Sequence, residues 1–200
     1  MMEWTAFEDQ ARAEGYTCIC GIDEAGRGPL AGPVYAAAVV LRPGQVIEGV
    51  NDSKKLSEKK REALFDTICS QCAAYGIGSA TEKEIDEINI LNATYLAMQR
   101  AVAALPVQPD CALVDGNRAP DLPLEVRTII KGDAQSASIA AASILAKVSR
   151  DRYMLQMAEK YPQYAFEKHK GYGTKLHYER LEQYGISPIH RLSFLKKWMN

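Results

Sequence analysis

Histidine is scarce in this chain of 200 residues, and its placement argues against one class of chemistry. The three histidines, His169, His177 and His190, all fall in the C-terminal part of the sequence. A zinc hydrolase built on histidine ligands is therefore poorly supported. The chain also lacks a G-x-S-x-G motif and a cysteine next to an obvious base, so covalent catalysis through serine or cysteine is poorly supported as well.

Cysteine is equally uninformative as a source of chemistry. The chain has 5 cysteines, an odd number, and it is long enough to build a hydrophobic core, which argues against a disulfide framework. Four of them (Cys18, Cys20, Cys69 and Cys72) could be zinc ligands. This alternative is weak, because neither pair has the glycine-bearing knuckle that usually presents thiolates. We expect all five to be buried as small apolar side chains.

Long apolar runs are missing too. The longest, VYAAAVVL, is far shorter than the roughly 18 residues that a membrane-spanning helix needs, so no membrane span is expected. The first residues, MMEWTAFEDQARAEGY, lack the basic-then-apolar layout of a secretory signal and hold too many acids for a transit peptide. We therefore expect a cytoplasmic protein.

Charge is balanced overall but unevenly distributed. Residues 1–146 carry 13 Lys and Arg against 20 Asp and Glu, whereas residues 147–200 carry 11 against 5. The C-terminal quarter thus has an excess of positive charge, which suits a polyanionic partner such as a nucleic acid. On charge alone, a solvated basic surface is an equally good alternative.

Apolar runs and helical patterns alternate along the chain. Strands are predicted at about 17–23, 33–41, 73–79, 111–115 and 126–131. Helices are predicted over 57–72 with Ser57 as N-cap, over 81–105 with a capping box of Thr81 and Glu84, from Ser136 or Ser138 to about 161, and over 174–185. This order indicates an α/β fold with a mixed five-stranded sheet flanked by helices, in which residues 1–155 form the core and the basic residues 156–200 a small helical extension of the same domain.

Three of the five predicted strands end in acidic residues. They are CICGIDE, which ends in Asp23 and Glu24, CALVDG with Asp115, and RTIIKGD with Asp133. Any one of these acids could simply form a turn or a cap. Ligands in open α/β sheets lie at the carboxyl ends of strands, however, and clustered carboxylates are costly unless a cation compensates them. The pattern therefore favours a site for Mg²⁺ or Mn²⁺, where two ions can activate water against a phosphodiester and stabilise the leaving oxygen.

A dinucleotide-binding turn is the alternative for the glycine-rich segment. Residues 26–31 satisfy G-x-G-x-x-A after a strand. Asp23 and Glu24 would then lie beside the pyrophosphate, and Pro29 and Pro33 interrupt the helix that should begin there. This alternative is disfavoured.

Several motifs in order carry a resemblance to a known family. They are GIDEAGRGPLAGPV, NDSKKLSEKKRE, EIDEINILNATYLAMQRAV, LVDGN, KGD, AASILAKVSRD, HKGYGT and HRLSF. Over about residues 17–195 the chain resembles the bacterial ribonucleases HII. The resemblance implies an RNase H-like fold and a metal-dependent endonuclease with two Mg²⁺ or Mn²⁺ ions. It would act on RNA in RNA/DNA hybrids and nick duplex DNA 5′ of an embedded ribonucleotide, leaving 3′-hydroxyl and 5′-phosphate ends, as in replication-linked ribonucleotide excision repair.

The resemblance also implies roles for single residues. The metal-binding and catalytic acids are expected to be the same four: Asp23, Glu24, Asp115 and Asp133. Asp151 is the main rival for the fourth place, but it lies inside a predicted helix between Arg150 and Arg152, where an ion pair on the helix surface is favoured.

Substrate contacts are implied in the same way. The ribose at the RNA-DNA junction is expected to be read by Gly26, Arg27 and Gly28. A 2′-hydroxyl both donates and accepts hydrogen bonds, and glycines let the backbone approach it. Tyr172 is expected to pack against the neighbouring sugar, and Lys54 and Lys55 to contact phosphate, with a solvated lysine pair as an equal alternative. Weaker candidates of the same kind are Lys147, Lys168 and Lys170.

Two other functions stay open at this point. One is a nucleic-acid-binding module without catalysis that holds a structural metal; the other is a metal-dependent hydrolase with a different substrate. A monomer is expected. The tail LSFLKKWMN could dock a partner such as a sliding clamp, although packing onto the domain is favoured.

Overall fold

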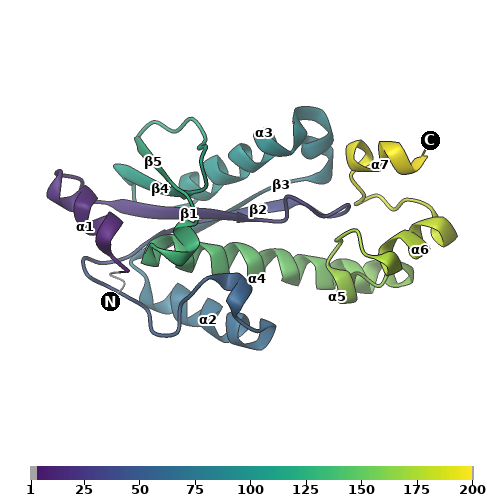
Figure 1. The fold of residues 1–200 in the computed structure, drawn as a ribbon, viewed down its shortest axis with the longest axis horizontal. Helices are drawn as coiled ribbons and strands as arrows, with labels where there is room; N and C mark the ends of the chain where they lie inside the picture. Colours follow the sequence, from purple (N-terminus) through teal and green to yellow (C-terminus); the bar gives the residue numbers. More distant parts are fainter. Residues whose placement is uncertain (1–3, 200) are drawn as a thin grey trace.

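The computed structural model describes residues 4–199 and contains one mixed five-stranded sheet (Figure 1). The strand order is β3-β2-β1-β4-β5, with β1, β2 and β3 antiparallel and with β4 and β5 parallel to β1. The strands are β1 (Ile19–Ala25), β2 (Val34–Val40), β3 (Ala74–Ala80), β4 (Cys111–Asp115) and β5 (Glu125–Ile129). The prediction of a mixed five-stranded sheet flanked by helices is confirmed.

The helices begin where side chains can satisfy free backbone N–H groups. Ser57 accepts from Lys60 N, Thr81 and Glu84 form the predicted capping box, and Ser136 accepts from Ile139 N. The α-helices are α1 (Ala6–Ala13), α2 (Glu58–Gln71), α3 (Glu82–Ala103), α4 (Ala137–Lys160), α5 (Phe166–His169), α6 (Lys175–Tyr184) and α7 (Leu192–Met199). Short 3₁₀ turns are η1 (Ser53–Lys55), η2 (Gly132–Ala134) and η3 (Pro162–Tyr164). The sequence did not predict α1.

The core lies in two layers, one on each face of the sheet. Figure 1 shows α3 over one face and α2 and α4 over the other. Along β2, Ala36 and Ala38 face the α3 layer, whereas Ala37 and Val39 face the α2 and α4 layer. Because residues on neighbouring positions of a strand point to opposite faces, this fully buried strand reads as a continuous apolar run.

Three local expectations need correction. The strand β1 continues through the acids to Ala25, because Ala25 still pairs with Tyr35 of β2. The strand β5 ends at Ile129, earlier than predicted, so Asp133 lies in the turn η2 beyond it. The helix predicted over 81–105 is interrupted at Asn89, whose φ of 67° kinks α3.

The prediction that all five cysteines are buried is wrong for two of them. Cys20, Cys72 and Cys111 are buried, whereas Cys18 and Cys69 are partly exposed, and all five thiols are free. Cys18 precedes the first residue of β1, and Cys69 lies on α2, where only Leu64 and Ile68 are buried.

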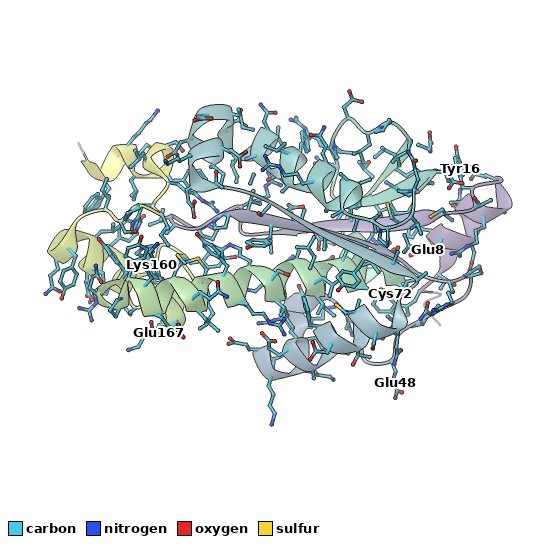
Figure 2. The ribbon with its side chains drawn as sticks, turned by 180° about the vertical axis from the view of Figure 1, so that it is seen from behind. Glu8, Tyr16, Glu48, Cys72, Lys160 and Glu167 are labelled. Atoms are coloured by element: carbon cyan, nitrogen blue, oxygen red, sulfur yellow. The ribbon has the colours of Figure 1, made fainter. Side chains whose placement is uncertain are left out.

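Residues 161–199 gather at one end of the molecule. Figure 1 places α5, α6 and α7 there, and in Figure 2 the labelled Lys160 and Glu167 mark this end while Glu8 and Tyr16 mark the opposite one. Its buried cluster includes Met154, Phe166, Leu181 and Leu195, so α7 packs onto the domain as favoured above. The predicted division after residue 155 falls inside α4 and stays a prediction. In the part of the chain that the structure describes, no helix is long and apolar enough to cross a membrane.

Candidate active site

The sheet register brings three of the predicted acids together. Ile22 of β1 pairs with Val114 of the parallel strand β4. Asp23 and Asp115 are the next residues of these two strands and therefore lie at the same level of the sheet. Asp115 in turn accepts a hydrogen bond of 2.6 Å from the backbone N–H of Gly132, the residue before Asp133. The ends of β1 and β4 and the turn after β5 thus converge on one edge of the sheet.

The acids at this edge raise one another's pKa. Asp23 is only 7% exposed, and burial, followed by the charges of Glu24 and Asp115, raises its pKa well above the usual range. Burial likewise raises the pKa of Glu24, and burial together with the charge of Asp133 raises that of Asp115. Deprotonated carboxylates in this position need compensation from a cation or from hydrogen-bond donors.

In the structure, nearby cations and a backbone N–H group compensate the negative charge of these carboxylates. Arg27 Nη1 lies 3.3 Å from Glu24 Oε1, Lys54 Nζ lies 3.5 Å from Asp133 Oδ2, and Asp23 accepts from the backbone N–H of Glu24 at 2.7 Å. Within residues 4–199, no group of three or more His, Cys, Asp and Glu side chains is arranged so that it could hold a metal ion. The zinc alternative for the cysteines therefore has no support.

The donor chemistry nevertheless fits a hard divalent cation. The four acids at this edge offer carboxylate oxygens as metal ligands, the ligand type that Mg²⁺ and Mn²⁺ prefer. In the structure one oxygen of Glu24 faces Arg27 and one oxygen of Asp133 faces Lys54.

A cleft of about 270 Å³ opens beside the acids. It is lined by Asp23, Glu24, Ala25, Gly26, Arg27, Gly28, Ser53, Lys54, Ser143, Lys147 and Tyr172. Most of the residues predicted from the resemblance therefore line one cleft, although Asp115, Asp133 and Lys55 are not among its lining residues. Ser53 and Ser143 were not predicted, because isolated serines carry no pattern that distinguishes a cleft from a turn or a helix.

Asp151 has a different role from the one considered in the sequence. Its Oδ1 accepts from Lys147 Nζ at 2.7 Å, so the expected ion pair exists. The pair is not on the helix surface, because the Asp151 side chain is only 5% exposed, and neither neighbouring arginine is the partner. Asp151 therefore holds Lys147, which lines the cleft.

Other hollows lie beyond this cleft. A hollow of about 600 Å³ is lined by the end of α3 and by residues 105–109 and 121–124, with Asp121 as its one ionisable lining residue. A second one, of about 380 Å³, shares Glu24 and Arg27 with the cleft and also touches Asp115 and Arg118. Glu24 and Arg27 thus line both the cleft and this second hollow.

Comparison with known proteins identifies the family. The model of the family described as Ribonuclease HII matches residues 20–197. The chain belongs to the ribonuclease HII family. A ribonuclease HII from Caldicellulosiruptor bescii is 60% identical over 189 residues, which cover 94% of this chain and 92% of the relative.

Solved structures agree with the ribonuclease HII assignment. The crystal structure of the ribonuclease H2 from Pyrococcus horikoshii OT3 is similar with a TM-score of 0.74 and 30% identity, covering 88% of this chain and 93% of that one. The structure of the PCNA:RNase HII complex from Archaeoglobus fulgidus is similar with a TM-score of 0.69 and 28% identity, covering 88% and 94%. The ribonuclease HII assignment makes this chain a type 2 ribonuclease H, a metal-dependent endonuclease, and disfavours a binding module without catalysis.

Proposed function

We propose that this ribonuclease HII cleaves the RNA strand of RNA/DNA hybrids and nicks duplex DNA on the 5′ side of an embedded ribonucleotide, leaving 3′-hydroxyl and 5′-phosphate ends. The observation that carries the proposal is the convergence of Asp23, Asp115 and Asp133 at one edge of the sheet, next to a glycine loop that lines a cleft together with Asp23 and Glu24. Ribose recognition and hydrolysis would then occur at adjacent points of one strand.

The residues that would hold the metal are Asp23, Glu24, Asp115 and Asp133. Two Mg²⁺ or Mn²⁺ ions, when bound, supply the activation of water and the stabilisation of the leaving oxygen. In the structure, Arg27 compensates Glu24 and Lys54 compensates Asp133.

The residues that would recognise the substrate line the cleft together with Asp23 and Glu24. Gly26, Arg27 and Gly28 would bind the ribose of the junction, and Tyr172, whose side chain is exposed, would pack against the next sugar. Lys54 is a better phosphate contact than Lys55, because Lys54 lines the cleft. Lys147, held by Asp151, is a further candidate.

The place of action and the partners follow from the same activity. A duplex of RNA and DNA, or DNA that contains ribonucleotides, is the proposed substrate, and the cytoplasm is the proposed location. The archaeal relative was solved in a complex with PCNA. Contact of this chain with a sliding clamp, and its monomeric state, stay predictions.

Cleavage of three matched duplexes tests the proposal. One strand carries only deoxyribonucleotides, a single ribonucleotide, or only ribonucleotides. We expect nicking of the second and third duplex in Mg²⁺ or Mn²⁺, none of the first, and none in EDTA. Asp23→Asn should lower the rate at least about 100-fold, since removing even an outer-shell partner of a metal ligand costs about 10- to 100-fold. Full activity in EDTA, or a wild-type rate for a folded Asp23→Asn protein, would sink the proposal.

A further inference from the structure

Arg191 is a buried cation that binds only backbone oxygens. Its side chain is 0% exposed, and its three guanidinium nitrogens donate to the carbonyls of Gly32 (2.8 Å), Arg27 (3.0 Å) and Gly26 (2.6 Å). Two of these carbonyls belong to the loop that lines the cleft. Arg191 therefore fixes the direction of the peptide groups on both sides of Arg27.

Arg150 holds the rest of the same segment. It is also 0% exposed and donates to the carbonyls of Ala31 (3.0 Å) and Pro33 (3.1 Å). Its guanidinium carbon lies 5.7 Å from the centre of the Tyr172 ring. Among residues 4–199, neither Arg150 nor Arg191 forms an ion pair with a carboxylate, although a buried unpaired charge is expensive. The two guanidinium groups therefore donate hydrogen bonds to five backbone carbonyls of residues 26–33.

His190 begins a second connection, which leads to Tyr172. The backbone N–H of Ser187 donates to His190 Nδ1 at 2.8 Å, which leaves the proton of a neutral His190 on Nε2. That nitrogen lies 2.9 Å from His177 Nε2, so His190 donates and His177 accepts. His177 Nδ1 then carries the other proton and donates to the carbonyl of Tyr172 at 2.9 Å. The tautomer of each ring is thus determined by the chain of hydrogen bonds.

The backbone joins these two connections. Arg191 N donates to the carbonyl of Leu30, and Leu30 N donates to the carbonyl of Gly171, each at 2.8 Å. Two neighbouring residues of the C-terminal extension, His190 and Arg191, therefore reach both sides of the cleft: one reaches the glycine loop directly and the other reaches Tyr172 through His177.

We propose that His190, His177 and Arg191 are positioning residues for ribonucleotide recognition, which hold the Gly26–Gly28 loop and Tyr172 at a fixed separation across the cleft. The proposal rests on the function proposed above for that loop and for Tyr172. It gives the extension a role in selecting the substrate in addition to any contact that its exposed lysines make with phosphate.

A merely structural role and a positioning role differ in what they change. Loss of structure lowers activity toward every substrate and lowers the melting temperature. Loss of positioning lowers the preference for a ribonucleotide, because a misplacement of about 1 Å at a binding group can cost on the order of 100-fold. The preference is the ratio of the Kd for an all-DNA duplex to the Kd for the same duplex with one ribonucleotide.

The test measures this ratio in an Asp23→Asn background, in which the bound duplex is not cut. We expect Asp23→Asn alone to prefer the ribonucleotide, and Arg191→Lys and His177→Phe each to lose roughly 10-fold or more of the preference with an unchanged Kd for the all-DNA duplex. Ile68→Ala is the matched control: Ile68 is buried on α2, far from these contacts in the sequence, so it should lower the melting temperature and keep the preference.

A double-mutant cycle covers the case in which Arg191→Lys does not fold. If His177 acts through Tyr172, His177→Phe adds nothing to the loss that Tyr172→Ala already causes. A folded His177→Phe protein that keeps its preference overturns the proposal. So does a His177→Phe substitution that lowers the preference by the same factor in the Tyr172→Ala background as in the Asp23→Asn parent. If the Asp23→Asn parent itself shows no preference, or cuts at the wild-type rate, the proposed function fails, and the positioning role that rests on it fails with it.

Discussion

A β-carbon added at Gly26 would collide with the side chain of Arg150, whereas one added at Gly28 would meet only the Tyr172 ring at 3.9 Å. Gly26 also has a φ of 97°, which side chains rarely adopt, whereas Gly28 has an ordinary backbone conformation. The first glycine is thus required by the fold of the loop. The second lines the cleft, where a β-carbon would meet no close contact.

Alanine at these two positions should separate stability from activity. Gly26→Ala should lower the free energy of unfolding by roughly 2–4 kcal/mol, through the strained φ and the contact with Arg150. Gly28→Ala should change it by less than about 0.5 kcal/mol, yet lower kcat/KM on a single-ribonucleotide duplex at least about 10-fold, because the methyl group would occupy the path of the ribose.

Urea unfolding and steady-state nicking of the two variants provide the measurements. Gly44→Ala serves as a control for the loss of a glycine with positive φ (67°) in open space away from the cleft, and it should leave kcat/KM unchanged. Normal nicking by Gly28→Ala would show that the ribose does not approach this backbone position.

The sequence predicted the residues of the cleft better than the residues that hold them. Asp23, Glu24 and Asp115 were predicted because each follows an apolar run, a pattern visible in the sequence even though β1 itself continues to Ala25. Arg191 and His190 were not, because a basic side chain in a basic segment indicates a solvated surface until the fold shows what surrounds it. Five carbonyls contributed by residues 26–33 cannot be read from a pattern near residue 191.

At the scale of elements, a buried carboxylate adds to the apolar contacts of Ala11 in attaching α1 to the rest of the molecule. Glu8 is 2% exposed, and its Oε1 accepts from Ser136 Oγ (2.6 Å), Ser138 N (3.0 Å) and Ser138 Oγ (2.6 Å). These groups belong to the first turn of α4, where the helix dipole also favours a negative charge. Glu8 thus caps a helix that begins 128 residues later.

Removing this carboxylate should destabilise the protein without touching the cleft. Glu8→Ala leaves two hydroxyls and one N–H buried without their acceptor, so we expect a loss of about 2–3 kcal/mol and a fall in Tm of roughly 4–12 °C. Gln10→Ala, on the same helix but exposed, should change stability by less than about 0.5 kcal/mol. Equal melting curves for the two variants, measured by circular dichroism, would contradict this role of Glu8.

The same element explains what sequence patterns miss. Caps such as Ser57 and the Thr81–Glu84 box are local, so they located α2 and α3 before the structure was known. The short helix α1 is held by serines more than 100 residues away, and β1 is extended to Ala25 by pairing with β2. Boundaries that depend on a distant partner are not encoded within the element itself.

At the scale of the whole molecule, the basic C-terminal quarter is less basic on its surface than its sequence suggests. Arg150 and Arg191 are fully buried, and the three histidines are buried as well. Electrostatic attraction of nucleic acid therefore depends on the exposed lysines and arginines of this part, and the buried cations act through hydrogen bonds to the segment before β2.

The three histidines make the extension sensitive to acid. His169 stacks on His177 at 4.3 Å between ring centres, and the rings of Tyr164 and Phe166 and the hydroxyl of Ser187 complete the surroundings. Burial, together with the charge of the neighbouring imidazoles, lowers the pKa of His177 and of His190 to about 4, although hydrogen bonds to the backbone act in the opposite direction. Protonation of His190 at Nδ1 removes the acceptor of the Ser187 N–H, and protonation of His177 at Nε2 removes the acceptor of the His190 Nε2–H.

Stability should therefore fall as the pH is lowered through the window between about 6.5 and 4. Above 6.5 the two imidazoles are neutral in both states, whereas below it the unfolded chain binds protons that the folded protein excludes. We expect a loss of roughly 2–4 kcal/mol between pH 7 and pH 5 from this source. The acid cluster, with raised pKa values, acts in the opposite direction, so the informative quantity is the difference in pH dependence between the wild type and a variant.

His190→Asn keeps an acceptor for Ser187 N–H and removes one titrating ring. Urea unfolding at pH 7 and pH 5 should show a smaller loss for His190→Asn than for the wild type, and equal losses would place the acid sensitivity outside this cluster.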